Sequence, residues 1–383
     1  MSKIPVVDVN IGEKEIEEVI KVVRSKFLIE GENTNQFESK FAKFTGAKHA
    51  ITIVNGTSAL HLSLTALGIG PGDEVITTPF TFIASSNAIT FNGAIPIFVD
   101  IDINTYNIDP EKIREAITDK TRAIMPVHIF GNPSNMKEIM EIANENDLYV
   151  IEDCAQAHDA RISGKHLGTF GTLGVFSFYG TKNLVGGEGG AIIFNDDELF
   201  EKIKSLKNHG RNPNGGYDHY QIGYNYRITD MVAAIMNVQM DRAPEILNRR
   251  HRNGDLYRKL LNDQDGLKIQ KILPNHTSSD YIFAPIITKK DITPQKIISY
   301  LKTKNIASRT IYSVLSYQQP CFTNISDWIF SRVVDYPDYT KVSCPNAEYI
   351  ATHHFELPMV STLTDENIYY IVDSLKSFLS ENI

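Results

Sequence analysis

The most constraining feature of this sequence is an alternation, from about residue 49 to residue 196, of short apolar runs with segments of helical period. Most of the runs are continuously apolar, which is typical of strands covered on both faces. Strands that alternate with helices predict a three-layer α/β/α domain with a mostly parallel sheet. The expected strands are His49–Val54, Glu74–Pro79, Ile95–Ile101, Arg122–Phe130, Tyr149–Asp153, Val175–Tyr179 and Ala191–Asn195.

The pattern changes after Asp230. A long helical stretch runs from Met231 to about Leu261, with Pro244 as an expected kink or junction. Fewer and shorter strand and helix signals follow, which predicts a smaller α+β domain. We therefore expect an N-terminal segment, residues 1–30, that packs on the core, a large α/β domain over residues 31–245, and a small C-terminal domain over residues 246–383.

Composition excludes several classes of protein. The 383 residues carry a formal net charge of −8, so the chain lacks the basic surface of a nucleic-acid binder. The three cysteines form no C-x-x-C pair, and no metal site is expected. No apolar run approaches the roughly 18–20 residues that span a bilayer. The sequence also shows no signal peptide, so we expect a cytoplasmic protein without a membrane partner.

Three of the expected strands end in chemically suggestive residues, and ligands of parallel sheets bind at such ends. The first segment is 55–60, where Gly56, Thr57 and Ser58 open a helix after the strand His49–Val54. A glycine permits close approach of an anion, and the helix N-terminus supplies free amides, which suits a phosphate. Taken alone, the segment is more typical of an ordinary helix cap. No Walker A or Gly-x-Gly-x-x-Gly motif supports ATP or a dinucleotide.

The second segment places Glu152 and Asp153 at the end of an apolar strand, where a carboxylate requires a cation or a hydrogen-bond donor. The third places Lys182 between an apolar strand and a glycine-dense turn, residues 186–190. A lysine removed from water loses its proton more readily and can condense with a carbonyl. Each segment also has an ordinary alternative: a carboxylate that caps the next helix, and a surface lysine in a flexible loop.

Together, the three segments match the needs of one cofactor, pyridoxal 5′-phosphate (PLP). Its phosphate requires the helix N-terminus, its ring nitrogen requires the acid, and its aldehyde requires the lysine.

These segments, together with residues 223–227, resemble the DegT-type sugar aminotransferases, which are fold-type I PLP enzymes related to aspartate aminotransferase. The resemblance implies that Lys182 bonds to the cofactor and shuttles a proton, while Asp153 pairs with the pyridine nitrogen. The other residues that it implies around the cofactor are Gln156 near the 3-hydroxyl, Gly56, Thr57, Ser58 and Ser177 at the phosphate, Phe82 stacked on the ring, and Asn225 reaching the phosphate of the neighbouring subunit. It thus implies a homodimer with shared sites.

The resemblance further implies transfer of an amino group from L-glutamate, which becomes 2-oxoglutarate, to a nucleotide-linked keto sugar. A 4-keto-6-deoxy sugar is favoured by residues 223–227. Candidate substrate contacts are Arg227, Arg309, Tyr217 and Tyr317, of which Tyr317 stands where members often have histidine. Asp159 stands where glycine is usual. Family dehydratases carry histidine in place of the lysine, so Lys182 favours transamination. The alternatives are a PLP lyase or dehydratase, a regulatory protein that binds PLP or a sugar nucleotide, and a structural protein without a cofactor.

Overall fold

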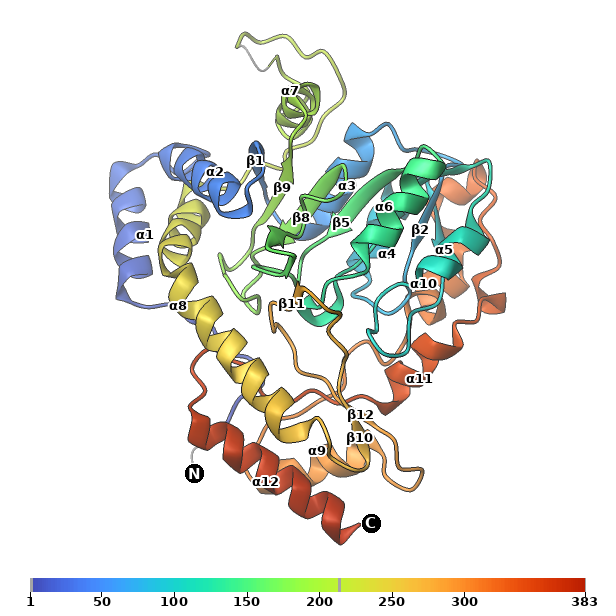
Figure 1. Ribbon diagram of the computed structural model, residues 1–383. Coiled ribbons are helices and arrows are strands. Elements are labelled where there is room, and N and C mark those ends of the chain that lie inside the picture. The colour runs from blue at the N-terminus through green and yellow to red at the C-terminus, as the bar shows by residue number, and fades with distance from the viewer. Residues whose placement is uncertain (1–2, 213–214, 383) are drawn as a thin grey trace.

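A seven-stranded sheet lies at the centre of the computed structural model, which describes residues 3–212 and 215–382 (Figure 1). All strands of the sheet point the same way except β9, which pairs antiparallel with both neighbours. Each predicted strand of the alternation is present, six of them within three residues of their expected bounds. The strand expected over Arg122–Phe130 ends at Met125, and a 3₁₀ turn occupies Ile129–Gly131. In order across the sheet the strands are β1 (His49–Ile53), β9 (Gly190–Phe194), β8 (Leu173–Ser177), β5 (Tyr149–Asp153), β4 (Thr121–Met125), β2 (Glu74–Thr77) and β3 (Ile95–Phe98).

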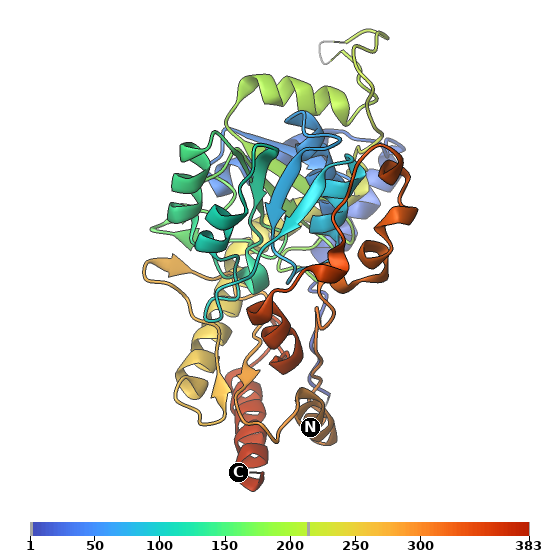
Figure 2. The ribbon, with the colours of Figure 1, turned by 90° about the vertical axis from the view of Figure 1, so that its right-hand side faces the viewer.

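Helices cover both faces of this sheet, as Figures 1 and 2 show. On one face, Phe41 of α2 (Glu32–Thr45) and Ile139 of α6 (Met136–Glu145) share a core with Phe176 of β8. On the other face, Leu62 of α3 (Gly56–Ala66) shares a second core with Val175 of the same strand. Because successive side chains of a strand point to opposite faces, both sets must be apolar. The prediction of a three-layer α/β domain is confirmed.

The other helices pack on the large sheet, beside α8, or in the C-terminal part. On the large sheet lie α4 (Ala84–Phe91), α5 (Pro110–Ala116) and α7 (Asp197–Leu206), while α1 (Glu13–Ser25) packs beside α8 (Asp230–Leu261). The C-terminal part contains α9 (Pro294–Thr303), α10 (Pro320–Thr323), α11 (Pro345–His353) and α12 (Asp365–Glu381). The short strands β6 (Arg161–Ile162), β7 (Lys165–His166) and β11 (His276–Thr277) were not predicted and form one small sheet. The strand β10 (Leu267–Lys268) pairs with β12 (Ile286–Ile287), which lies within the expected strand or helix signal Tyr281–Thr288.

The C-terminal part has a core of its own, in which Tyr257 of α8 packs with Leu301 of α9 and Ile371 of α12. Figure 1 shows this body below the large sheet, with both chain ends beside it. The helix α8 runs unbroken through residue 245 with Pro244 inside it, so one rigid element joins the two parts. Near the N-terminus, Ile4 pairs with Ile306 and belongs to the smaller core. The exact domain boundaries remain a prediction.

Within residues 3–212 and 215–382, none of the helices combines the length and the apolar character that crossing a membrane requires.

Candidate active site

The three predicted segments come together because β1, β5 and β8 point the same way, so their carboxyl ends lie along one edge of the sheet. The helix α3 begins at Gly56, three residues after β1 ends. Asp153 is the last residue of β5, and Ser177 is the last residue of β8, five residues before Lys182. This edge is where a parallel sheet binds ligands.

The N-terminus of α3 is held tightly against β8 and β9. A Cβ atom on Gly56 would lie 2.9 Å from Cβ of Ser177, and one on Gly190 would lie 2.6 Å from the backbone of Asn55. Glycine is therefore required at both positions for this close approach. The side chain of Asn55 accepts a hydrogen bond from the Ser58 N–H at 2.8 Å. The other N–H groups of the first turn have no partner within the helix and suit an anion.

Asp153 is a buried carboxylate with a donor on each oxygen. Oδ2 accepts from the Ser85 hydroxyl at 2.8 Å, and Oδ1 accepts from the Ala155 N–H at 3.1 Å. Burial raises the pKa of Asp153, while the Ala155 N–H, the Ser85 hydroxyl and the charge of Lys182 oppose that shift. A cationic partner at Asp153 would favour its ionised form further.

The neighbouring Glu152 points to the opposite face of the sheet and has a structural role. Its carboxylate accepts from the N–H groups of Gly168, Phe170 and Gly171 at 2.7–2.8 Å, and Nε2 of His128 lies 3.3 Å away. His128, Glu152 and Cys154 are buried, with potential ligand atoms within 4.8 Å of one another. Since the Glu152 oxygens already hold the 168–171 loop, this cluster fixes the loop beside β5.

The amine of Lys182 faces an aromatic ring from the C-terminal part of the chain. Nζ lies 4.7 Å from the centre of the Tyr281 ring, and the Tyr281 hydroxyl is 3.2 Å from Oγ1 of Thr181. The lysine side chain is half-buried. The positive charge of Lys182 acts on Asp153, so the acid and the amine belong to one site.

Gln156 and Phe82 complete the wall around these two groups. Oε1 of Gln156 accepts from the Phe130 N–H at 2.8 Å, and its Nε2 donates to the Tyr312 hydroxyl at 3.2 Å. Phe82 precedes α4 and is 59% exposed, which is unusual for a phenylalanine beside buried residues. An exposed aromatic face three residues from Ser85 suits a planar ligand.

The candidate substrate residues lie in different surroundings. Asn225 is exposed and pairs with Asn208, whose side chain also accepts from Arg227 at 2.7 Å. Tyr217 is 81% exposed. These residues lie in the stretch between α7 and α8, whose middle part projects from the molecule in Figures 1 and 2.

Arg309 and Tyr317 differ sharply in their access to the site. Arg309 pairs with the buried Glu356 at 2.7 Å and lines a small cavity together with Thr181 and Tyr281, which flank Lys182. Tyr317 is only 3% exposed, and its hydroxyl donates to Glu348 at 2.6 Å. The structure thus brings Arg309 near the lysine and places Tyr317 in the core.

Three residues of this site were not identified from the sequence: Ser85, Tyr281 and Tyr312. Ser85 could have been found, because it follows a fourth strand end, that of β2, in a run with Thr81 and Phe82. Tyr281 lies in the C-terminal part, far in sequence from any strand of the large sheet. Tyr312 lies between the candidate substrate contacts Arg309 and Tyr317 but was not itself given a role.

These residues fit PLP on structural grounds. The glycine-dependent approach of α3 to β8 leaves a helix N-terminus for a phosphate, and the buried carboxylate of Asp153 lacks a cationic hydrogen-bonding partner among the described residues. The exposed ring of Phe82, three residues before Ser85, offers a stacking surface for the planar ring. The residues that would hold the group are therefore those at the ends of β1, β2, β5 and β8.

Comparisons with known proteins agree with this geometry. The model of the DegT/DnrJ/EryC1/StrS aminotransferase family matches residues 9–376. The chain is 36% identical to GDP-perosamine synthase of Escherichia coli O157:H7, with all of both chains covered. It is 35% identical to UDP-N-acetyl-3-dehydro-alpha-D-glucosamine 3-aminotransferase of Acidithiobacillus ferrooxidans, covering 94% of this chain and 92% of that protein.

A solved structure shows the same fold. The structure of S. venezuelae DesV in complex with a ketimine intermediate superimposes with a TM-score of 0.90, at 30% identity and over 99% of each chain. The large sheet and the C-terminal part are thus those of a fold-type I PLP aminotransferase, as the resemblance implied. From its sequence over nearly the whole length and from its fold, the chain belongs to the DegT/DnrJ/EryC1/StrS aminotransferase family.

Proposed function

We propose that the protein transfers an amino group from L-glutamate to a nucleotide-linked keto sugar, with a 4-keto-6-deoxy sugar as the preferred acceptor, for glycan assembly. The observation that carries the proposal is the convergence of Asp153, Lys182 and the N-terminus of α3 at one edge of the sheet. The names of two relatives support the acceptor class, because one specifies a GDP-linked and the other a UDP-linked sugar.

PLP, when bound, supplies an aldehyde for reversible bonding to amines and a ring that accepts an electron pair. The chain's own residues would control that chemistry. Asp153 would hold a proton on the ring nitrogen, since Ser85 and Ala155 favour its ionised form. Lys182 would bond to the aldehyde and, once released by an incoming amine, carry a proton between substrate and cofactor. Gly56, Thr57, Ser58 and Ser177 would fix the phosphate, and Gln156 the 3-hydroxyl.

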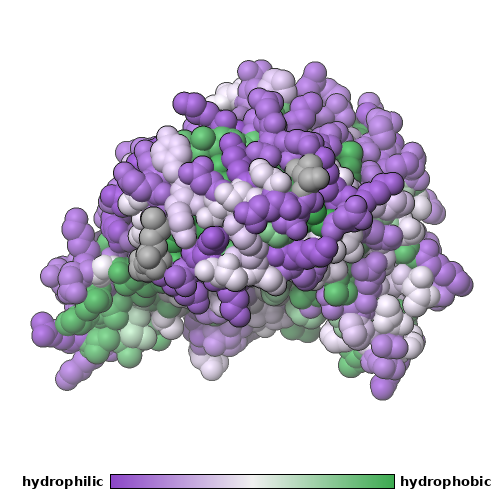
Figure 3. All heavy atoms as spheres, turned by 90° about the horizontal axis from the view of Figure 1, so that it is seen from below, coloured by the Kyte–Doolittle hydropathy of each residue, from purple (hydrophilic) through white to green (hydrophobic). Residues whose placement is uncertain are grey.

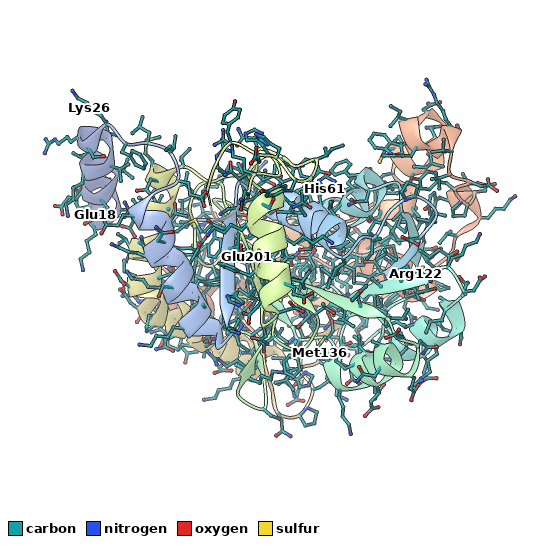
Figure 4. All side chains as sticks on the ribbon, turned by 90° about the horizontal axis from the view of Figure 1, so that it is seen from above. Glu18, Lys26, His61, Arg122, Met136 and Glu201 are labelled. Carbon is teal, nitrogen blue, oxygen red and sulfur yellow. The ribbon has the colours of Figure 1, made fainter. Side chains whose placement is uncertain are left out.

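We also propose that the protein is a homodimer with shared active sites. The exposed apolar surface on α1 and just after it supports this proposal. Ile16, Ile20 and Val23 of α1 are 41–52% exposed, and Phe27 and Ile29, which follow the helix, are 53% and 64% exposed. Figure 4 shows α1 at the margin of the molecule, with Lys26 at its end, and Figure 3 shows hydrophobic atoms gathered at one side of the underside. Contiguous apolar patches of this kind mark interfaces.

The projecting segment provides a second apolar surface, with Tyr220 at 69% and Ile222 at 93% exposure close to Asn225. In a dimer this segment would bring Asn225 to the partner's phosphate site. A hybrid test checks this sharing. Lys182→Ala and Asn225→Ala proteins, each inactive alone, should regain activity on mixing, because one site of a hybrid dimer is intact. Failure to regain activity between subunits that do exchange would contradict shared sites.

The substrate is tested with purified protein, glutamate and a panel of GDP-, UDP- and TDP-linked 3-keto and 4-keto sugars. We expect an amino sugar and 2-oxoglutarate in equal amounts, with the 4-keto-6-deoxy sugars fastest. A product that has lost a substituent without gaining nitrogen would indicate a dehydratase or lyase. If the protein is coloured but glutamate does not change its visible band, it is a binding protein. If it is colourless and gains no band when PLP is added, it has no PLP cofactor.

A further inference from the structure

Asp159 occupies a backbone conformation that favours glycine. Its φ is +63°, in the left-handed region that glycine adopts most readily. Asp is among the few other residues that tolerate this region. Here its carboxylate Oδ1 accepts from Nε of Arg161 at 2.8 Å. The side chain of Asp159 therefore adds contacts that a glycine cannot make.

The second carboxylate oxygen of Asp159 faces His251 of α8. Nε2 of His251 lies 3.3 Å from Oδ2 of Asp159, and Nδ1 lies 3.4 Å from Oδ2 of Asp280. Because each ring nitrogen faces a carboxylate, the cationic form of His251 is favoured, and the two acids raise its pKa to about 9 against burial. Three arginines and one histidine also lie here: Arg161 and Arg258 pair with the two acids, Arg250 donates to the backbone carbonyl of Asp280 at 3.5 Å, and His166 lies next to the Asp159 backbone.

Asp280 is built into the surface of α8. A Cβ atom on Gly254 would lie 2.4 Å from Cγ of Asp280, so the helix needs glycine there to admit the carboxylate. Arg258, one turn further along α8, donates to both oxygens at 2.6 and 3.1 Å. Asp280 is 3% exposed. The contacts with Gly254 and Arg258 therefore hold Asp280 against α8.

The segment that contains Asp280, residues 278–281, lies against the active site. The Ser279 hydroxyl donates to the backbone carbonyl of Gln156 at 2.7 Å, and its own carbonyl accepts from Asn183 at 2.8 Å. Tyr281 follows Asp280 directly, and its ring faces the amine of Lys182. A shift of Asp280 would therefore be transmitted to the ring that covers the lysine.

We propose that Asp159 and His251 are positioning residues that, through Asp280, hold the ring of Tyr281 over Lys182 and restrict access to its amine. The inference rests on the proposed role of Lys182.

The test measures how fast trinitrobenzenesulfonate labels Lys182 in the full-length protein after removal of PLP, with the labelled peptide quantified by mass spectrometry. Melting curves first confirm that each variant is folded. Lys182 should be labelled at least threefold faster in Asp159→Gly than in the original protein. In Asp159→Asn, which keeps a hydrogen-bond acceptor without the charge, the labelling rate should be intermediate. Asp147→Gly is the matched control, because Asp147 also has a left-handed φ of +54° and is exposed. It should label at the original rate.

Two further measurements distinguish a specific effect on the position of the Tyr281 ring from a general loss of packing in the variant. The ratio of the Asp159→Gly rate to the original rate should fall towards one above about pH 10, because deprotonation of His251 then weakens the network in the original protein too. In a Tyr281→Leu background, which itself labels fast, Asp159→Gly should add nothing. Equal labelling of Asp159→Gly and the original protein, or additive effects with Tyr281→Leu, would overturn the proposal. Neither result would affect the assignment of Lys182, which borohydride trapping of the loaded enzyme tests separately.

Discussion

The hydroxyl of Ser85 donates to Oδ2 of Asp153 at 2.8 Å, and both side chains are buried. The two residues are 68 positions apart in the chain. Oγ1 of Thr81 lies 3.1 Å from the same hydroxyl, so the first turn of α4 orients the acid, and the segment before the helix supports that hydroxyl and carries Phe82. A fixed carboxylate can meet a ring nitrogen without first reorganising.

Ser85→Ala should weaken PLP binding. A hydrogen bond to a charged group contributes about 1.5–3 kcal/mol, so the dissociation constant should rise about tenfold or more. Titration of the cofactor-free protein with PLP, followed by the visible band, measures it. Ser86→Ala is the control, because the buried Ser86 hydroxyl has no hydrogen-bond partner among the described residues. Unchanged binding by Ser85→Ala would mean that Ala155 alone orients Asp153.

Lys182→Ala should abolish multiple turnover, since the variant lacks the amine that we propose to bond to the aldehyde and to move the proton. The direct measurement is borohydride reduction of the loaded enzyme followed by digestion. A reduced pyridoxyl label is expected on the peptide containing residue 182 and should vanish in the variant. Lys204→Ala, at an exposed position on α7, should keep both label and activity. A label on any other lysine would refute the assignment.

Tyr317→Phe should reduce stability without changing substrate affinity. The hydroxyl bonds to Glu348 and accepts from the Cys344 N–H at 3.2 Å inside the core, so its loss should cost about 1–2 kcal/mol in the free energy of unfolding. Urea unfolding measures this loss of stability. The KM for the nucleotide sugar should change by no more than about twofold, whereas loss of a substrate contact that contributes about 1.4 kcal/mol would raise it about tenfold. Tyr349→Phe, at a more exposed tyrosine, is the control. A large rise in KM would support the substrate role that the sequence suggested for Tyr317.

His251 should make stability fall at alkaline pH. Its pKa is raised from the usual 6.5 to about 9 in the folded protein, so its contribution is complete below pH 6.5 and disappears as the pH rises through 9. Between pH 6.5 and 10 the original protein should lose about 2 kcal/mol more unfolding free energy than His251→Gln, given 1.36 kcal/mol per pKa unit and some offset from the partners. Urea unfolding at several pH values gives both curves, with His353→Gln, at a half-buried histidine, as the control. Parallel curves for the original protein and His251→Gln would contradict the ion pairs.

Much of the fold follows from local pattern. Continuous apolar runs predicted all seven strands of the large sheet, because a strand covered on both faces must be apolar at every position. The same strands located Gly56, Asp153 and Lys182, since each lies at or just beyond the end of one of them. The carboxylate of Asp153 and the amine of Lys182 are groups that an apolar environment does not tolerate without a ligand or partner. The two-residue strands β6, β7 and β11 are too short to show any period, so the sequence did not predict them.

What the sequence by itself determined was therefore the layered architecture, the strand ends and the kind of chemistry that their residues could perform. Only the tertiary structure decided which distant residues meet: Ser85 with Asp153, Tyr281 with Lys182, and His251 with both Asp159 and Asp280. It also showed that Tyr317, which the sequence suggested as a substrate contact, lies in the core. The physical reason is that periodicity reports burial along one element. Contacts between elements depend instead on the order of strands in the sheet and on how α8 carries the C-terminal part against it, which no local stretch of sequence encodes.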